Sequence, residues 1–171
     1  QMCIRDRFNP AHRLINQTIE ASISHGISKT ETLEQEAITL YEEMQLPNPT
    51  EIGDRFPHQV SGGQLQRTMT AMAMSSKPDL IIFDEPTTAL DVTTQVNVLA
   101  TIRNIVKEHN TAAIYITHDL AVVAQMADRI QVLRYGNTIE ESETKKMLKT
   151  PKEDYTKSLW AVRSLKKKEH K

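Results

Sequence analysis

Two short apolar runs separated by an amphipathic helical pattern constrain the fold of this chain more than any other feature. Residues 79–84 (Asp-Leu-Ile-Ile-Phe-Asp) and 112–116 (Ala-Ala-Ile-Tyr-Ile) have the length and composition of strands buried on both faces. Between them, Asp91 can cap a helix. The apolar face of that helix contains Val92, Val96, Leu99, Ile102 and Val106. A strand, a helix and a strand in this order predict an α/β fold with a parallel sheet and right-handed crossovers.

The residues before the first apolar run predict a helical subdomain. Asn9-Pro10 can begin one helix, because Asn is a good N-cap and Pro suits the first helical position. Gly26 is a stop signal for this helix. Ser28-Lys29-Thr30-Glu31 has the form of a capping box and introduces a second helix that extends to Met44. Prolines follow that helix and end it, and residues 50–59 are expected to be a connector.

The residues after the second apolar run predict a helix, a hairpin and two more helices. Residues 119–126 have a helical pattern. Earlier in the chain, before the first apolar run, a short helix is also predicted from about Gly62 to Met74. Strands are expected over residues 129–134 and 138–141, and Tyr135-Gly136-Asn137 between them favours a hairpin. The last two helices are predicted at residues 143–149 and 154–165, before a basic tail.

Composition excludes several classes of protein. Lys and Arg number 21 and Asp and Glu number 22, so a net charge of −1 provides no positive field for nucleic acid or an anionic membrane. Cys3 is the only cysteine, which excludes an intramolecular disulfide and suits a reducing compartment. No apolar window is long enough to span a bilayer, and we expect neither a membrane span nor a secretory signal.

Ser61-Gly62-Gly63-Gln64 is the first candidate site. Ser61 and Gln64 have capping-box spacing, but the two glycines between them are poor helix formers. One reason for them is the approach of a large anion to the backbone N–H groups of the helix start, where Cβ atoms would obstruct it. The alternative is an ordinary capped helix. In either case, alanine at Gly63 is expected to leave stability unchanged or raised, because alanine is the better helix former.

Acidic and histidine side chains follow the two apolar runs. Asp84-Glu85 ends the first run, and Thr117-His118-Asp119 follows the second. Ligands of open parallel sheets bind beyond the carboxyl ends of the strands, so these side chains can meet there. One acid could hold Mg²⁺ through water while the other polarises an attacking water, and His118 could contact a phosphate oxygen. The alternatives are an acidic helix start before Pro86 and a strand-end histidine with a structural role.

The order of these motifs resembles that of the ATP-binding cassette ATPases. The similarity extends over most of the chain, from about Phe8 onward. The residues that carry it are Val60-Ser61-Gly62-Gly63-Gln64-Leu65-Gln66-Arg67, Leu80-Ile81-Ile82-Phe83-Asp84-Glu85-Pro86-Thr87-Thr88-Ala89-Leu90-Asp91 and Ile116-Thr117-His118-Asp119. In this resemblance, Ser61 to Gln64 match the signature element, and Ala89-Leu90-Asp91 match a loop that contacts the partner subunit.

The resemblance implies a partial P-loop NTPase-type core, with a parallel sheet and flanking helices, preceded by a helical subdomain. Members of the family act as head-to-tail dimers that hold ATP between the phosphate loop of one subunit and the signature helix of the other. The signature residues would therefore contact ATP held by the partner. The resemblance gives Asp84 the role of holding Mg²⁺ through water. It also implies that Glu85 directs water at the γ-phosphate and that His118 contacts that phosphate.

Three further matches point to a subfamily. Asn9-Pro10, Phe56-Pro57-His58-Gln59 and Asp154-Tyr155-Thr156-Lys157-Ser158-Leu159 resemble segments of the ATPase subunits of oligopeptide, dipeptide, nickel and glutathione importers. The resemblance implies coupling of ATP hydrolysis to uptake of peptides or similar small solutes. It implies a second ATPase subunit and membrane permease subunits as partners, and a solute-binding protein indirectly. Such subunits lie in the cytoplasm, on the inner face of a bacterial or archaeal membrane.

The sequence also departs from the family pattern. No G-x-x-x-x-G-K-[ST] phosphate loop occurs in the 171 residues. The chain thus resembles the back part of a cassette and is expected to be truncated and inactive alone. The expected domains are a helical signature subdomain at 8–60, the C-terminal part of the ATPase core at 61–165 and a basic tail at 166–171, with residues 1–7 unassigned.

Two other functions remain open at this stage. The chain could belong to a soluble cassette ATPase of repair or translation, although the match at residues 154–159 favours transport. It could also be a short non-catalytic protein that donates only the signature surface to a partner.

Overall fold

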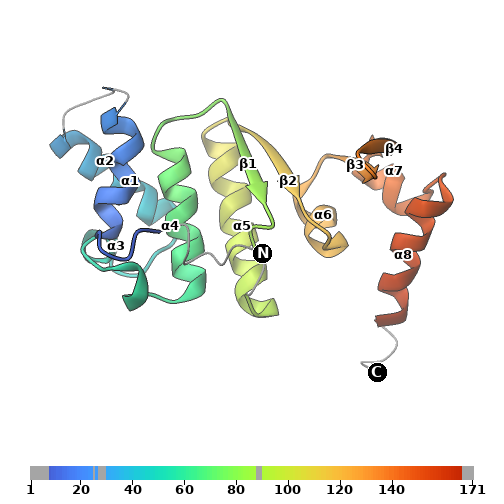
Figure 1. Cartoon of the computed structure of the whole chain (residues 1–171), viewed down its shortest axis with the longest axis horizontal. Coiled ribbons are helices and arrows are strands. Elements are labelled where there is room, and N and C mark those ends of the chain that lie inside the picture. Colours follow the sequence, from blue (N-terminus) through green and yellow to red (C-terminus); the bar gives the residue numbers. More distant parts are fainter. Residues whose placement is uncertain (1–7, 25, 27–29, 88–89, 167–171) are drawn as a thin grey trace. The chain divides into compact units, whose positions relative to one another are not determined.

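The structure is a computed structural model that describes residues 8–24, 26, 30–87 and 90–166 (Figure 1). The chain divides into two compact units, Gln1–Ile114 and Tyr115–Lys171. Among the described residues, every helix is too short or too polar to cross a membrane.

The helical part of the first unit is built around α1 (Leu14–Ser24), α2 (Thr30–Glu43) and α4 (Gly62–Met74). They pack against one another, as Figure 1 shows. Their shared core is apolar, and its largest fully buried side chains include Leu14, Tyr41, Met44, Ile52 and Leu65. The phenol of Tyr41 is hydrogen-bonded to Thr18, with 2.6 Å between the two hydroxyl oxygens. Burial raises the pKa of Tyr41 to about 12 despite this hydrogen bond.

The start of α1 differs from the sequence prediction. Asn9-Pro10 does not begin the helix, because the Asn9 side chain accepts a hydrogen bond from the Ala11 N–H and forms a turn. The buried Gln17 side chain holds this turn: its Oε1 accepts from the Asn9 N–H and its Nε2 donates to the Asn9 carbonyl. A helix cap depends only on neighbouring residues. This turn depends on the side chain of Gln17, eight residues further along the chain.

The segment between α2 and α4 is more ordered than a connector. It contains the helix α3 (Pro49–Ile52) and the 3₁₀ helix η2 (Pro57–Gln59). Asn48 precedes α3 in a left-handed conformation with φ of 48°, which Asn tolerates better than most residues. The capping box predicted at Ser28 involves residues outside the described part of the chain, although the helix that it introduces is present as α2.

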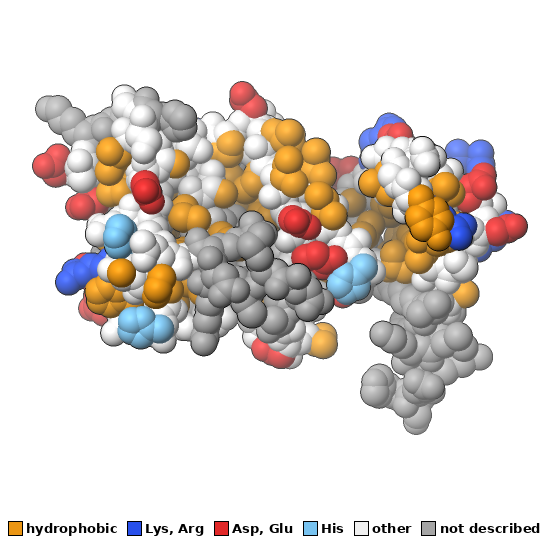
Figure 2. Space-filling view, in the orientation of Figure 1, with side chains coloured by type: hydrophobic (Ala, Val, Ile, Leu, Met, Phe, Trp, Pro, Cys, Tyr) orange, Lys and Arg blue, Asp and Glu red, His pale blue; other side chains and the backbone are white. Residues whose placement is uncertain are grey.

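The strand–helix–strand unit is confirmed, but the burial of its strands is not. The strands β1 (Leu80–Asp84) and β2 (Ala112–Ile116) are neighbours in a parallel two-stranded sheet and are joined through α5 (Val92–Glu108). Side chains of β1 alternate, so that Ile81 and Phe83 are buried while Leu80 and Ile82 are 49% and 59% exposed. Figure 2 shows hydrophobic side chains gathered on the surface over β1.

The prediction that both strands are buried on both faces is therefore wrong for this structure. In β2, Ile114 and Ile116 are also about half exposed, at 47% and 51%. An apolar run shows that both faces of a strand tolerate burial. Whether the second face is covered depends on elements elsewhere in the sequence.

The buried face of α5 also differs in part from the prediction. Leu99 and Ile102 are buried as expected, but Val92 is 77% exposed and Val96 is 47% exposed. The remaining buried positions of the helix are Val98, Thr101 and Ile105. Both sets of residues have helical spacing, so packing against α4 decides between them.

The second unit contains α6 (Leu120–Met126), the antiparallel hairpin of β3 (Arg129–Arg134) and β4 (Asn137–Glu143), α7 (Thr144–Lys149) and α8 (Asp154–Lys166). The hairpin is confirmed, and its register pairs Arg134 with Asn137. Tyr135 and Gly136 form the two-residue turn with φ of 51° and 79°, as a tight hairpin requires. Ile130, Val132 and Met147 form the buried core of this unit, against which Leu159 and Trp160 pack.

Candidate functional site

Ser61 and Gln64 form the predicted capping box at the start of α4. The Ser61 Oγ accepts from the Gln64 N–H at 3.3 Å, and the Gln64 Oε1 accepts from the Ser61 N–H at 2.8 Å. Ser61 and Gly62 are exposed, so the helix start is open to solvent. The free N–H groups and the helix dipole make such a start suitable for an anion.

Gly62 faces Leu90, which precedes α5, and Gly63 faces the first turns of α5. A Cβ built at Gly63 would lie 2.6 Å from the Thr94 Cγ2, and one built at Gly62 would lie 3.5 Å from the Leu90 Cδ2. The first distance is far below a van der Waals contact, and Gly63 is buried. The expectation that alanine at Gly63 leaves stability unchanged or raised is therefore contradicted. Helix propensity is outweighed here by a clash between helices.

Asp84 and Glu85 lie at the carboxyl end of β1, as predicted. Asp84 is the exposed last residue of the strand, and Glu85 is partly buried. Glu85 has a left-handed backbone with φ of 49°, which is strained for a residue other than glycine. Strain of this kind costs on the order of 1–3 kcal/mol and gathers at functional sites. Five other described non-glycine residues, among them Asn48 and Tyr135, have a φ of 48–52° as well, so the candidate role of Glu85 depends on its motif and its position at the end of β1.

Asp91 caps α5, as predicted, and both of its carboxylate oxygens accept hydrogen bonds from Thr94. Its Oδ2 accepts from the Thr94 hydroxyl at 2.6 Å, and its Oδ1 accepts from the Thr94 N–H at 3.0 Å. The side-chain and backbone donors of Thr94 lower the pKa of Asp91 below its ordinary value. Leu90 is partly buried, and Ala89 lies outside the described residues.

His118 belongs to the second unit, two residues after the end of β2, and it is exposed. The neighbouring Asp119 N–H donates to the Thr117 Oγ1 at 3.1 Å, which shapes the turn after the strand. The first unit thus contains the signature residues, Asp84, Glu85 and the Leu90–Asp91 loop, and the second contains His118. In the parts of both units that the structure describes, no three Cys, His, Asp or Glu side chains are grouped as metal ligands.

Sequence reasoning missed two residues that shape this region. Thr94 joins Asp91 to Gly63, and the available signal was a β-branched residue three positions after an Asp cap. Arg67 is the other: its Nη1 donates to the Gln45 carbonyl at 2.6 Å, which ties α4 to the end of α2. Burial lowers the pKa of Arg67. The Gln45 carbonyl lies 22 residues before Arg67 in the sequence, so no local pattern predicts this hydrogen bond.

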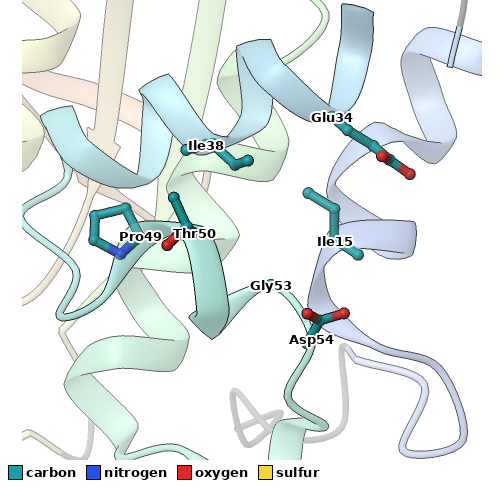
Figure 3. Close-up of a pocket in the computed structure, with 7 residues that line it drawn as sticks. All are labelled: Ile15, Glu34, Ile38, Pro49, Thr50, Gly53 and Asp54. Atoms are coloured by element: carbon teal, nitrogen blue, oxygen red, sulfur yellow. The ribbon is translucent and has the colours of Figure 1, made fainter. Parts of the chain in front are cut away.

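A small cavity of about 140 Å³ lies apart from these motifs, in the helical part of the first unit. Figure 3 shows its lining, to which Ile15 contributes from α1 and Glu34 and Ile38 from α2. Pro49, Thr50, Gly53 and Asp54 complete it. None of the predicted site residues lines this cavity.

Comparison with known proteins finds a family model and relatives that all describe transport proteins. A family model described as ABC transporter matches residues 4–88. The oligopeptide transport ATP-binding protein OppD of Lactococcus lactis subsp. cremoris is 42% identical over 151 residues, which is 88% of this chain and 45% of OppD. The probable D,D-dipeptide transport ATP-binding protein DdpD of Escherichia coli K12 is 40% identical over 86% of this chain and 45% of its own length.

A third relative shares this pattern. The glutathione import ATP-binding protein GsiA of Pectobacterium atrosepticum is 39% identical over 90% of this chain and 25% of its own length. The chain thus spans less than half the length of these curated relatives. Their names agree with the importer subfamily to which the sequence motifs pointed.

Solved structures confirm the fold. The ATP-binding cassette MJ0796, as a dimer in a post-hydrolysis state with ADP and Pi, matches with a TM-score of 0.67 and 25% identity over 82% of this chain and 60% of its own. A metal-chelate type ABC transporter in an inward-facing conformation matches with a TM-score of 0.69 and 27% identity over 81% of this chain and 55% of its own. With the motif order, the family match and these relatives, the chain belongs to the ABC transporter family.

Proposed function

We propose that the chain is part of the ATP-hydrolysing subunit of an ABC importer that takes up peptides or similar small solutes. The observation that carries this proposal is the 39–42% identity to OppD, DdpD and GsiA, which extends over 86–90% of the chain. The adjacent carboxylates of Asp84 and Glu85 at the carboxyl end of β1 also support an ATPase role, because ligands of open parallel sheets bind beyond this end of the strands.

The signature half of the site is proposed to act in trans. In a head-to-tail dimer, Ser61 and the first N–H groups of α4 would bind the γ-phosphate of ATP held by the partner subunit. The capped, solvent-open helix start supports this role, because it directs N–H groups and a positive dipole end outward. No lysine is needed on this side of the nucleotide.

The hydrolytic half is proposed to use acidic side chains and a histidine. The Asp84 carboxylate fits Mg²⁺, a hard cation that prefers oxygen ligands and retains several waters, and the metal would neutralise phosphate charge. Glu85 would accept a proton from the attacking water and orient it toward the γ-phosphate. His118 would donate a hydrogen bond to a γ-phosphate oxygen.

The phosphate loop is proposed to lie in a further part of the complete subunit. The sequence contains no G-x-x-x-x-G-K-[ST] run, and it spans less than half the length of relatives such as OppD. We further propose that residues 8–60 act as the helical signature subdomain and residues 61–165 as the remaining core. The 171 residues alone should neither bind ATP at sub-millimolar nucleotide by calorimetry nor hydrolyse it. Turnover by the purified chain would contradict this part of the proposal.

The partners and location follow from the same proposal. A second ATPase subunit would complete the nucleotide sites, membrane permease subunits would receive the closing motion, and a solute-binding protein would deliver solute. The subunit would lie on the cytoplasmic face of the membrane.

The decisive experiment reconstitutes the complete subunit with its permease subunits in proteoliposomes. ATP-dependent uptake of labelled oligopeptides, dipeptides and glutathione is measured with Mg²⁺ present. We expect uptake of at least one solute that stops without ATP. ATP hydrolysis without coupled transport would instead favour a soluble cassette ATPase, and absence of hydrolysis would favour a non-catalytic protein.

A further inference from the structure

The glycine pair of the signature packs against the loop and helix start at residues 90–94 of the same chain. The position of a Gly62 Cβ lies 3.5 Å from the Leu90 Cδ2, and that of a Gly63 Cβ lies 2.6 Å from the Thr94 Cγ2. Val98 Cγ2, one turn further along α5, lies 3.9 Å from the same Gly63 position. The start of α4 therefore approaches α5 closely enough to exclude even a methyl group at Gly63.

Thr94 cannot easily yield to such a methyl group. Its hydroxyl donates to the Asp91 Oδ2 and its N–H donates to the Asp91 Oδ1. The hydroxyl bond holds the χ1 angle, and this places Cγ2 over Gly63. Rotating the methyl group away would also rotate the hydroxyl away from Asp91. One side chain thus joins the carboxylate of the loop to the backbone of the signature.

We propose that Thr94 is a positioning residue that couples the Leu90–Asp91 loop to the signature helix start within one subunit. Gly63 is then a glycine because Thr94 occupies the place of its Cβ. This inference rests on the proposed function, which gives the loop a role at the subunit interface and the signature a role at ATP. A change of partner at Asp91 during dimer closure would be transmitted through Thr94 to the start of α4.

Two substitutions separate the two contacts of Thr94. Thr94→Ser retains the hydroxyl for Asp91 and removes the methyl group that faces Gly63. Thr94→Val retains the methyl group that faces Gly63 in a side chain of nearly the same shape, and it removes the hydroxyl. Thr101→Ser is the matched control, because Thr101 is a buried threonine of the same helix whose hydroxyl bonds to the Asn97 carbonyl instead.

The experiment measures melting temperature and ATP turnover of the complete subunit with these variants. Gly63→Ala should lower the melting temperature by about 3–10 °C and also reduce turnover. Adding Thr94→Ser to Gly63→Ala should recover most of both losses, and adding Thr101→Ser should recover neither. Thr94→Val should reduce turnover at saturating ATP by about tenfold, with the KM for ATP little changed.

Three results would overturn the proposal. Gly63→Ala could melt at or above the temperature of the parent, which would mean that Thr94 does not occupy the Cβ position. Thr94→Ser could restore melting but not turnover, which would limit the contact with Thr94 to stability and assign the loss of turnover to the nucleotide side of Gly63. Thr94→Val could turn over like the parent, which would remove the link to Asp91. An inactive parent would instead overturn the proposed function, while the melting temperatures would still decide the contact.

Discussion

At the scale of single residues, the adjacent acids Asp84 and Glu85 differ in backbone conformation and in exposure. Glu85 directly follows β1 and has a left-handed backbone with φ of 49°, a conformation that five other described non-glycine residues share, and it is partly buried. Asp84, one residue earlier, ends β1 in an exposed, ordinary strand conformation. Adjacent carboxylates in such different settings suit the different roles proposed for them.

Replacing Glu85 with Gln tests its proposed role as the base. Glutamine retains the size and shape of the side chain but cannot accept the proton of the attacking water. In the complete subunit, Mg-ATP should still bind, turnover should fall by about 10²–10⁴-fold, and the ATP-bound dimer should persist. Turnover is measured by phosphate release and dimerisation by size exclusion. Near-normal turnover would reduce Glu85 to a residue of the helix start.

At the scale of elements, helix caps do most to position the candidate site. The capping box of Ser61 and Gln64 sets where α4 begins, and Asp91 sets where α5 begins. Both caps face the same small region, because α4 and α5 pack together there. Changes at either cap should therefore alter both stability and the geometry of the signature.

Ser61→Ala and Ser61→Gly separate capping from nucleotide contact. Loss of the hydroxyl cap to alanine costs about 1 kcal/mol of stability, while glycine at an N-cap costs only a few tenths. If Ser61 contacts ATP in trans, both variants of the complete subunit should lose turnover while ATP binding to one monomer is retained. Melting curves and turnover are compared for the pair. Turnover that follows stability, reduced in the alanine variant only, would show that Ser61 acts solely as a cap.

The Asp91 cap should depend on pH in a defined direction. Hydrogen bonds from the Thr94 side chain and N–H lower its pKa from the ordinary value of 3.8, so the folded state favours the charged form. The stabilisation is complete above pH 3.8 and is lost as the pH falls below it, through the folded-state pKa. Asp91→Asn provides the control, since asparagine caps without titrating. The melting temperature of the parent relative to this variant should be constant above pH 3.8 and fall below it. A constant difference at all pH values would contradict the shift.

At the scale of the whole molecule, an uncovered apolar sheet face is the main departure from a conventional globular surface. Leu80 and Ile82 in β1 and Ile114 in β2 are about half exposed. Exposed apolar surface of this kind, together with open strand edges, promotes association between chains. The purified 171-residue chain should therefore be poorly soluble.

Replacing Ile82 with Lys tests this explanation. The Ile82 side chain is 59% exposed, so lysine can reach water there without disturbing the core. The variant chain should remain monomeric at concentrations at which the parent aggregates, as measured by light scattering. Ile81→Lys is the control, because Ile81 is only 7% exposed and its replacement should unfold the chain. Equal aggregation of parent and Ile82→Lys would show that this face is not responsible.

Much of the fold was predictable from short-range patterns. The bounds of α4, its capping box, the Asp91 cap and the hairpin at Tyr135-Gly136 all depend on hydrogen bonds and dihedral preferences within a few residues. The order of the motifs also identified the family, because motif order is a property of the sequence and does not depend on tertiary structure. The roles of all the candidate site residues, from the signature at Ser61 through Glu85 to His118, remain predictions.

Tertiary structure alone decided the features that depend on distant partners. Gln17 turned Asn9-Pro10 from a helix start into a turn, and packing against α4 selected which apolar side of α5 is buried. The reason for Gly63 is likewise a neighbour thirty-one positions away, Thr94. Local sequence determines which backbone conformation a segment prefers, and such a preference is worth at most about 1 kcal/mol per residue for residues other than proline. Packing contacts outweigh that preference wherever a side chain from another element fills the space, and no local pattern records which element that is.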